Sequence, residues 1–359
     1  MKVLHLINQL TVGGAEKLIL ETIPLYNKKG ITTDVVVHKS DKDHLFLSQL
    51  KEKKCCKIFE LSYNSVYDPR VIFRLRKFLK SYDVIHAHVF PGFYFLAISK
   101  ILFKCKAKLV YTEHSTNNRR LHLSIFKYID QYIYSKFDKI VCITDEVKKV
   151  LTTHIKIDDN RIETIHNGIN LEVIKKTKQK IPLVKSLIDK TIICQISAFR
   201  IEKDHTTLIK SLQHLSENVI LILAGDGSTK PSMELLSENL NLSERVFFLG
   251  NRSDTPQIMF SSDILVLSSL YEGLSLSSIE AMASGKPFVA SRVPGLKELV
   301  NDHGVLFEFG NEKDLAKKII SLTNNKSYYN EIVKKCQAKA AQYDISIMIN
   351  KHIELYNAL

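Results

Sequence analysis

The stretch from residue 264 to residue 290 reads ILVLSSLYEGLSLSSIEAMASGKPFVA. It opens with the apolar run Ile264–Leu267, which is typical of a buried strand. Gly273 lies in the polar loop that follows, and a short helix is predicted from there to Gly285, where a glycine and a nearby proline favour a helix end. A second strand is predicted at Lys286–Ala290. A strand, a helix and a strand in this order predict a parallel sheet with crossover helices.

The same alternation extends over the rest of the 359 residues, which is enough chain for two domains. We therefore predict an α/β protein with two doubly wound, Rossmann-like domains facing a cleft. The further predicted strands are Lys2–Asn8, Val35–His38, Asp83–Ala87, Lys108–Thr112, Lys139–Ile143, Thr191–Ser197, Val219–Ala224 and Val246–Leu249. The further predicted helices are Ala15–Tyr26, Pro69–Ser81, Phe93–Phe103, Leu121–Lys136 and Thr206–Leu215.

The domain boundary is predicted from composition. A polar, Lys-rich stretch at Lys175–Lys180 is typical of a linker. We assign residues 1–174 to the first domain, 175–185 to the linker and 186–343 to the second domain. In doubly wound sheets ligands bind beyond the carboxyl ends of the strands, so the loops there are where functional residues are expected.

Composition narrows the class of protein. Apolar residues make up 45% and charged residues 25%, as in an ordinary globular protein. The longest apolar stretch, Val89–Ile98, is about half the roughly 20 residues of a spanning helix, and the N-terminus lacks the pattern of a signal peptide. None of the six cysteines forms a C-x-x-C pair, which argues against zinc and redox motifs. We expect a cytoplasmic protein.

The net charge of +13 is concentrated in the first half, where residues 1–170 hold 28 Lys and Arg against 17 Asp and Glu. This asymmetry is compatible with an anionic partner such as membrane lipid or a phosphorylated acceptor, and equally with a solvated basic face. Two segments are candidates for contact with the inner membrane face: the basic side of helix 70–80 and the loop Asn117–Leu121. Nucleic-acid-binding motifs are absent, so no nucleic acid partner is expected.

Two glutamates, Glu272 and Glu280, flank the start of the helix predicted in the opening stretch. Ser275 or Ser277 is expected to cap this helix, whose N-terminus then suits a phosphate. Glu280, expected near the first turn, could accept hydrogen bonds from two sugar hydroxyls. The alternative is that both carboxylates only complement the helix dipole.

Two cations, Arg200 and Lys203, share the loop after the first strand of the second domain. They are expected to converge on a diphosphate and to stabilise the charge that develops on it, as a divalent metal would. Two nearby surface cations are common, so this pair alone is a weak indication.

The glycines Gly13 and Gly14 follow the first strand and let the backbone approach a ligand, or simply form a tight turn. The G-x-G-x-x-G pattern of nicotinamide-binding sites is absent.

Three histidines, His86, His88 and His114, lie at strand ends. Because no carboxylates stand at the spacing of zinc ligands, they do not indicate a zinc site. His114 is a candidate for contact with sugar hydroxyls, and His88 is a weaker one.

Taken together, these motifs resemble glycosyltransferase family 4, which has the GT-B fold. The resemblance covers Gly13–Glu16, Asp83–His88, Thr112–His114, Asn167–Ile169, Arg200 with Lys203, and the Glu-x7-Glu run from Glu272 to Pro287. It implies retention of anomeric configuration, no metal or other cofactor, and a nucleotide sugar held mainly by the second domain. The first domain would bind the acceptor, and the last helix, near 344–359, would pack back on it.

The resemblance also implies roles for single residues. Glu272 would lie beside the donor sugar, Glu280 would hold the ribose, and His114 would meet the sugar from across the cleft. The implied catalytic residues are Glu272, Arg200, Lys203 and His114; the implied donor-binding residues are Gly13, Gly14, Gly227, Asn251, Arg252, Gly273, Leu274, Ser275 and Glu280. Asp204 and Ser275 stand where glycine is frequent in the family.

The sequence therefore predicts transfer of a hexose or N-acetylhexosamine from a UDP-sugar to a saccharide or lipid-linked acceptor of a cell-surface polysaccharide. One alternative is a nucleotide-sugar epimerase or hydrolase of the same fold, which would act without an acceptor. Another is a non-catalytic partner of a second transferase.

Overall fold

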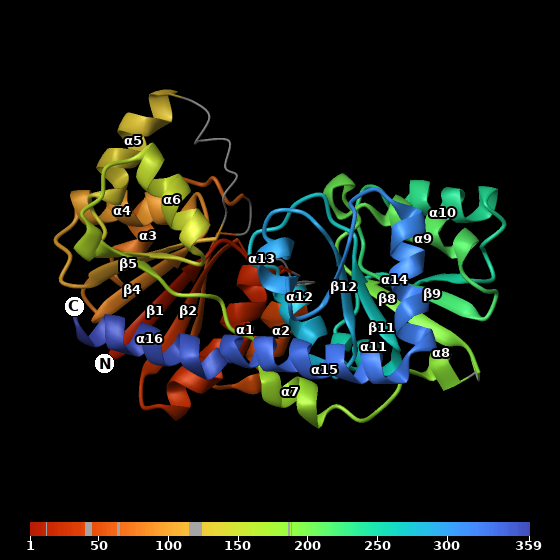
Figure 1. Cartoon of the computed structure of the whole chain (residues 1–359). Coiled ribbons are helices and arrows are strands. Elements are labelled where there is room, and N and C mark those ends of the chain that lie inside the picture. The colour runs from red at the N-terminus through yellow and green to blue at the C-terminus, as the bar shows by residue number, and fades with distance from the viewer. Residues whose placement is uncertain (12, 40–44, 63–64, 115–123, 186, 188) are drawn as a thin grey trace. The chain divides into compact units, whose positions relative to one another are not determined.

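The computed structural model describes residues 1–11, 13–39, 45–62, 65–114, 124–185, 187 and 189–359 (Figure 1). The candidate membrane loop Asn117–Leu121 lies outside the described residues. The chain divides into two compact units, one formed by Met1–Gly168 with Ile345–Leu359 and the other by Ile169–Asp344. The predicted boundary at residue 174 falls inside α7 (Leu171–Lys176), a helix that belongs to the second unit.

Unit 1 is built on a seven-stranded sheet in the order β3-β2-β1-β4-β5-β6-β7, with every pair of neighbours parallel. The strands are β1 (Lys2–Ile7), β2 (Thr32–Lys39), β3 (Ile58–Ser62), β4 (Val84–His88), β5 (Lys108–Glu113), β6 (Lys139–Cys142) and β7 (Ile162–Thr164). Its helices are α1 (Gly14–Lys28), α2 (Leu45–Lys53), α3 (Val71–Leu75), α4 (Gly92–Leu102), α5 (Ser124–Tyr134), α6 (Asp145–His154) and α16 (Ile345–Asn357).

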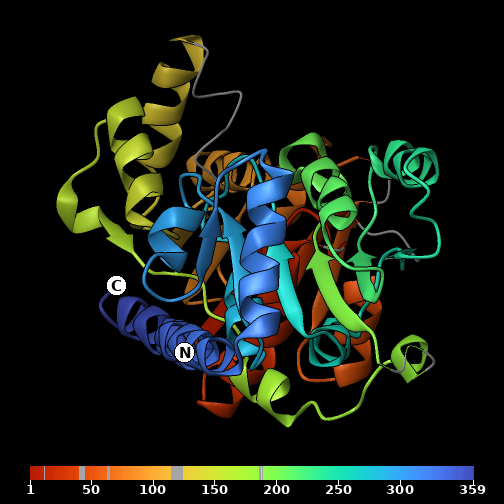
Figure 2. The ribbon, with the colours of Figure 1, turned by 45° about the vertical axis from the view of Figure 1, so that its right-hand side comes forward.

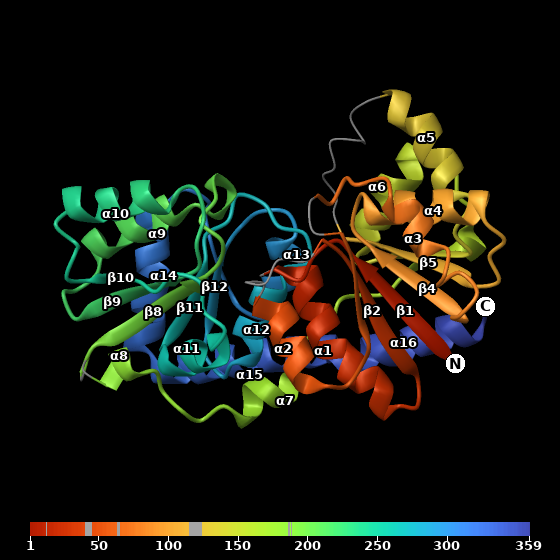
Figure 3. The ribbon, with the colours of Figure 1, turned by 180° about the vertical axis from the view of Figure 1, so that it is seen from behind.

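The two faces of this sheet are covered by different helices. Alternate residues of β1 point to opposite faces, as in any strand. Leu4 and Leu6 join a buried cluster with residues of α3, α4 and α6. Ile7 joins a second cluster with α1 and α2, which Figure 3 shows beside β1 and β2. The C-terminal helix α16 packs against α1 and therefore belongs to this second face.

Unit 2 repeats the design with six parallel strands in the order β10-β9-β8-β11-β12-β13. The strands are β8 (Thr191–Ile196), β9 (Val219–Ala224), β10 (Val246–Phe248), β11 (Ile264–Leu267), β12 (Phe288–Ser291) and β13 (Val305–Phe307). Its longer helices besides α7 are α9 (His205–Ser211), α10 (Lys230–Asn239), α11 (Thr255–Ser261), α12 (Leu276–Ala283), α14 (Glu312–Asn324) and α15 (Lys326–Ala340); the short ones are α8 (Pro182–Lys185) and α13 (Leu296–Val300).

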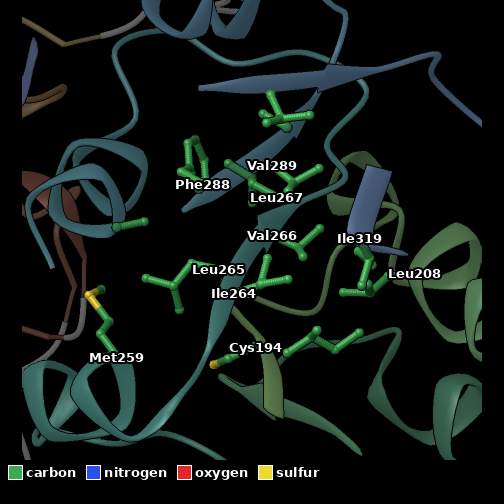
Figure 4. Close-up of a cluster of buried hydrophobic side chains, with 14 of the residues drawn as sticks. Cys194, Leu208, Met259, Ile264, Leu265, Val266, Leu267, Phe288, Val289 and Ile319 are labelled. Atoms are coloured by element: carbon green, nitrogen blue, oxygen red, sulfur yellow. The ribbon is translucent and has the colours of Figure 1, made fainter. Parts of the chain in front are cut away.

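The core of unit 2 surrounds β11, all four residues of which are buried (Figure 4). Apolar side chains from both sides of the strand fill it, among them Met259 of α11 and Ile319 of α14. Figure 2 shows α14 lying along the sheet, and its contacts with β12 and β13 agree. A strand buried on both faces explains why Ile264–Leu267 is apolar without alternation.

Both sheets have the Rossmann strand order, in which successive strands are added first to one side of the first strand and then to its other side. In unit 1 this switch lies between β1 and β4, and in unit 2 between β8 and β11. The loops that follow these four strands therefore flank the two places where a doubly wound sheet binds ligands.

Most predicted elements are present with small shifts at their ends, and β9 and β11 match residue for residue. The helix predicted over Pro69–Ser81 is wrong in length, since α3 covers Val71–Leu75 and the chain continues in turns. The predictions omitted the strands β3, β7 and β13 and the helices α2, α6, α7, α8, α13, α14 and α15, and they gave no bounds for α10 and α11. Among the described residues, no helix combines the length and the apolar character needed to cross a membrane.

Candidate active site

A buried glutamine joins the two loops at the switch point of unit 2. Gln195 lies near the end of β8, and its Oε1 accepts a hydrogen bond from the backbone N–H of Ser268, 3.1 Å away, just beyond β11. Its Nε2 donates to the carbonyl of Lys203 at 3.1 Å. The sequence interpretation overlooked Gln195, although a polar residue inside an otherwise apolar strand was a usable signal.

The same loops carry an ion pair between Lys203 and Glu272. The Nζ of Lys203 bonds to Oε1 of Glu272, which also accepts a hydrogen bond from Ser269 Oγ at 2.6 Å. The two side chains are only 19% and 9% exposed, so water screens their attraction little. Two predicted site residues that lie far apart in the sequence are thus brought together.

Arg200 is placed differently from Lys203. Its side chain is 68% exposed, and its guanidinium lies 3.9 Å from the carboxylate of Glu202. The two cations therefore have different surroundings: Lys203 lies at the end of a 3-10 turn, Ile201–Lys203, and is largely buried, whereas Arg200 is extended before that turn and exposed. Arg200 is left as an accessible cation at the rim of the loop.

Asp204 explains a departure from the family pattern. Its φ of +40° lies in the left-handed region, which glycine adopts most easily and aspartate tolerates better than most residues. Its carboxylate also accepts a hydrogen bond from the backbone N–H of Thr207 at 3.2 Å and so caps α9. The aspartate thus supplies a cap that glycine could not.

The helix α12 begins as predicted. Ser275, rather than Ser277, is the N-cap, and its Oγ accepts a hydrogen bond from the backbone N–H of Ser278 at 3.3 Å. Gly273 and Leu274 lie in the loop before it. The prediction that Glu280 lies near the first turn is wrong: it is the fifth residue of α12, in the second turn, and is buried. This position weakens the alternative in which Glu280 only complements the helix dipole, since that effect fades beyond the first turn.

The glycines at the end of β9 approach the Arg200 loop closely. A Cβ atom at Gly225 would lie 1.9 Å from the carbonyl oxygen of Ser197, and one at Gly227 would lie 2.3 Å from that of Phe199. Both glycines are therefore required by the packing of two loops, whatever ligand they meet.

Asn251 and Arg252 are exposed beyond β10. Arg252 donates two hydrogen bonds to Asp254, at 2.7 and 2.6 Å, and these raise the pKa of Arg252.

In unit 1, Gly13 and Gly14 lie at the switch point between β1 and β4. Gly13 is the N-cap of α1, with extended backbone angles, and Gly14 is the first residue of that helix. A Cβ atom at Gly13 would lie 2.3 Å from a carboxylate oxygen of Glu16, the far end of a movable side chain. Neither glycine has a side chain that could cover the backbone at the start of α1.

A cluster of five histidines lies on the sheet face that α1 and α16 cover. Its members are His5, His86, His88, His114 and, from α16 itself, His352. His86 bonds through Nδ1 to the hydroxyl of Tyr356 and through Nε2 to that of Thr112, both at 2.6 Å. Burial lowers the pKa of each imidazole, to about 3 for His5 and about 4 for His114 and His352, and well below the usual value for His86 and His88. All five are therefore neutral near pH 7.

Among the described residues, one group of side chains could hold a metal ion, and it consists of three of these histidines. The candidate ligand atoms of His5, His86 and His88 all lie within 4.8 Å of one another. Both nitrogens of His86 are already bonded to hydroxyl groups, and His5 and His88 are hydrogen-bonded to each other. Their arrangement is accounted for by hydrogen bonds within the protein.

Comparison with known proteins decides the family. The model of Glycosyltransferase Family 4 matches residues 12–173, and that of Glycosyl transferases group 1 matches residues 176–339. The chain is a family 4 glycosyltransferase. The two matches meet within α7, and together they cover most of both Rossmann-like units.

Relatives of the transferase are known from bacteria. An Escherichia coli enzyme named UDP-Gal:alpha-D-GlcNAc-diphosphoundecaprenol alpha-1,3-galactosyltransferase is 24% identical over 81% of this chain and 80% of its own. A Campylobacter jejuni enzyme named N-acetylgalactosamine-N,N'-diacetylbacillosaminyl-diphospho-undecaprenol 4-alpha-N-acetylgalactosaminyltransferase is 24% identical over 94% of both chains. The crystal structure of Anabaena HepE with UDP and glucose covers both chains fully, with a TM-score of 0.85 and 20% identity. The transferase thus has the GT-B fold.

Proposed function

We propose that the transferase moves a hexose or N-acetylhexosamine from a UDP-sugar to a lipid-linked saccharide, with retention of anomeric configuration and without a metal ion. The names of the Escherichia coli and Campylobacter jejuni relatives, which specify diphosphoundecaprenol acceptors, support the acceptor class. The UDP in the related HepE structure supports the nucleotide.

The observation that carries the proposal is the Lys203–Glu272 pair at the switch point of unit 2. Lys203 and the accessible Arg200 would bind the diphosphate, and Glu272 would lie beside the sugar. Glu280 would hold the ribose, and His114, from unit 1, would contact the sugar. Fixed cations can stabilise the charge that develops on a leaving diphosphate, so the chemistry needs no metal ion.

In the proposed reaction the bond between the anomeric carbon and the diphosphate oxygen breaks while the acceptor hydroxyl forms a new bond on the same face. The acceptor proton passes to the diphosphate, which leaves protonated. Lys203 and Arg200 stabilise the negative charge as it builds, an effect that is strongest where water is excluded. The pairing of Lys203 with Glu272 keeps its ammonium in place before the donor binds.

Nucleotide binding in EDTA is the first test. Titration calorimetry with UDP, GDP, ADP and NAD is expected to show binding of UDP alone or most tightly. Binding of NAD alone, or of nucleoside diphosphates only after metal is added, would contradict the proposal. Incubation of a UDP-sugar without acceptor distinguishes the epimerase or hydrolase alternative, which predicts a changed sugar, and binding without turnover would favour the non-catalytic one.

Retention is tested by the configuration of the product. Proton NMR of the new glycosidic linkage, recorded early in the reaction with an α-linked donor, is expected to show an α-anomeric signal. A β-anomeric product would overturn the retaining mechanism and leave the donor site unaffected.

The role of Arg200 is tested by Arg200→Ala. Removing one fixed stabiliser of developing charge typically lowers turnover by about 100- to 1000-fold. Since Arg200 is exposed, the thermal midpoint is expected to stay unchanged. Lys317→Ala, which removes an exposed cation of α14 in the same unit, is the matched control and should retain full activity. An Arg200→Ala enzyme of normal turnover would remove the assigned role.

We further propose that a basic hollow of unit 1 contacts anionic lipid at the membrane surface. The hollow has a volume of about 530 Å³ and is lined by Glu60, Leu61, Phe73, Arg74, Arg76, Lys77 and Lys80. Phe73 is 66% exposed among these cations, a combination that suits a headgroup beside an acyl chain. The opposite side of the segment is buried, at Val71 and Leu75, as expected for a crossover helix.

Vesicle flotation tests this contact. The variant Arg74→Gln, Arg76→Gln, Lys80→Gln should bind vesicles of phosphatidylglycerol more weakly than the wild type at low salt. The control Lys313→Gln, Lys317→Gln, Lys334→Gln removes the same charge from exposed positions of unit 2 and should bind as the wild type does. Equal loss in both variants would mean that only net charge matters.

A further inference from the structure

Three histidines of unit 1 form a hydrogen-bonded row that ends at His114. His5 lies on β1, His88 ends β4, and His114 follows β5. The Nδ1 of His5 lies 3.1 Å from Nε2 of His88, and the Nδ1 of His88 lies 3.3 Å from Nε2 of His114. The pairing of β1 with β4 and of β4 with β5 places all three on the face that α1 and α16 cover.

Each ring in this row is neutral near pH 7, because burial lowers the pKa of all three imidazoles. A neutral imidazole has one N–H donor and one acceptor nitrogen. Two hydrogen bonds in series therefore allow only two arrangements of the protons, and each arrangement fixes the tautomer of all three rings. The position of the proton on His5 therefore determines the tautomer of His114.

The buried end of the row favours one arrangement. The Nε2 of His5 is buried and has no hydrogen-bond partner among the described residues. If the protons ran toward His5, this atom would be an unpaired buried N–H donor, which proteins avoid more strongly than an unpaired acceptor. In the other arrangement Nδ1–H of His5 donates to His88, and Nδ1–H of His88 donates to Nε2 of His114.

We infer that His5 and His88 are positioning residues that hold His114 in the tautomer with its proton on Nδ1. His114 then presents an N–H donor, which can bond to a sugar oxygen, rather than a second acceptor. His114 is only partly buried, and no described residue is hydrogen-bonded to its Nδ1. The inference rests on the proposed function in one respect, the contact of His114 with the donor sugar.

His86 does not belong to this row, although its ring stacks on that of His88 with centroids 4.3 Å apart. Its two nitrogens are bonded to Tyr356 and Thr112 instead. His352 also lies in the cluster, with its ring centroid 5.5 Å from that of His86, and is outside the row. His352 therefore provides a matched control for replacing a buried histidine here.

Nitrogen NMR of the full-length protein labelled with 15N-histidine tests the tautomer directly. In the wild type, His114 is expected to carry its proton on Nδ1. In His88→Phe, which keeps a buried ring without hydrogen bonds, His114 should change to Nε2–H or to a mixture, while His352→Phe leaves it unchanged. A wild-type His114 with its proton on Nε2, or an unchanged His114 in His88→Phe, would overturn the inference.

Kinetics add a second measurement. Loss of a partner that orients a metal-ligating histidine typically lowers activity by about 10- to 100-fold, and we take the same range for the orientation of His114. We expect this loss in kcat of His88→Phe, with unchanged UDP binding, since the assigned diphosphate residues lie in unit 2. If His88→Phe does not fold, His5→Phe, which removes the donor to His88, tests the same row.

Different results would contradict the sugar contact of His114 and the positioning role of His5 and His88. Full activity of His114→Ala would remove the sugar contact from the proposed function, while the NMR result would still decide whether the row fixes the tautomer. An inactive His114→Ala together with full activity of His88→Phe would keep the sugar contact and overturn the positioning role.

Discussion

At the scale of single residues, the Lys203–Glu272 pair is expected to contribute to stability and, under the proposed function, to activity. Removing one member of a buried ion pair leaves the other charge without compensation, which costs about 3 kcal/mol. We expect that loss in the free energy of unfolding of Lys203→Met, measured by urea denaturation. The double variant Lys203→Met, Glu272→Gln should recover most of the stability and none of the activity. Recovery of activity in the double variant would show that the pair is structural only.

The sequence located these residues but not their surroundings. Glu272, Glu280 and Lys203 were found because their spacing follows a motif. The exposure of Arg200 depends on a 3-10 turn that places Lys203 inward, and the motif carries no information about that turn. Gly227 is predicted to bind the donor, and the motif does not show that the carbonyl of Phe199 by itself already requires a residue without a side chain there.

At the scale of elements, Gly295, the N-cap of α13, fixes the loop that carries Glu272. Its φ is +83°, and a Cβ atom there would lie 2.0 Å from the carbonyl oxygen of Glu272. Gly295→Ala should therefore displace this loop, lower the free energy of unfolding by more than about 2 kcal/mol and reduce turnover. The added Cβ atom would meet a backbone carbonyl, which cannot move aside as the end of a side chain can.

Gly310→Ala is the matched control for this prediction. Gly310 has a similar φ of +70°, and a Cβ atom there would meet nothing within 4 Å. It should cost only the backbone strain of a left-handed alanine, about 1 kcal/mol. Equal losses in the two variants would mean that the loop contact contributes nothing.

A clear apolar pattern, continuous or periodic, decided which elements could be predicted. The buried strands β9 and β11 are continuous apolar runs and were placed to the residue. In α6, only Val147 and Leu151 are buried, so its apolar pattern is too sparse to read, and β13 has three residues. The parallel order of strands followed from the alternation of strands and helices, which permits few topologies.

At the scale of the whole molecule, the two units differ in their buried histidines. Unit 1 contains the five-histidine cluster, in which His114 is partly buried and the other four are buried; α16 contributes His352. Unit 2 has His205, whose pKa burial lowers to about 4. No local sequence pattern predicts the cluster, because it combines side chains from β1, β4, the end of β5 and α16.

This difference predicts that acid unfolds unit 1 before unit 2. The cluster histidines have an ordinary pKa of 6.5 in the unfolded chain and far lower values when folded, such as about 4 for His114 and His352. Below pH 6.5 the unfolded state therefore binds more protons, and stability is lost as the pH falls toward 4. Each such proton costs about 1.4 kcal/mol per pH unit.

Hydrogen exchange measured by mass spectrometry can follow both units in the intact chain. Between about pH 7 and about pH 5, after correction for the intrinsic exchange rate, protection should fall in β1, β4 and α16 before it falls in β8 and β11. His352→Phe removes one titrating group of the cluster and should make the loss in unit 1 less steep. A parallel loss in both units, or a loss confined to unit 2, would contradict the prediction, since five histidines that must remain uncharged lie in one unit only.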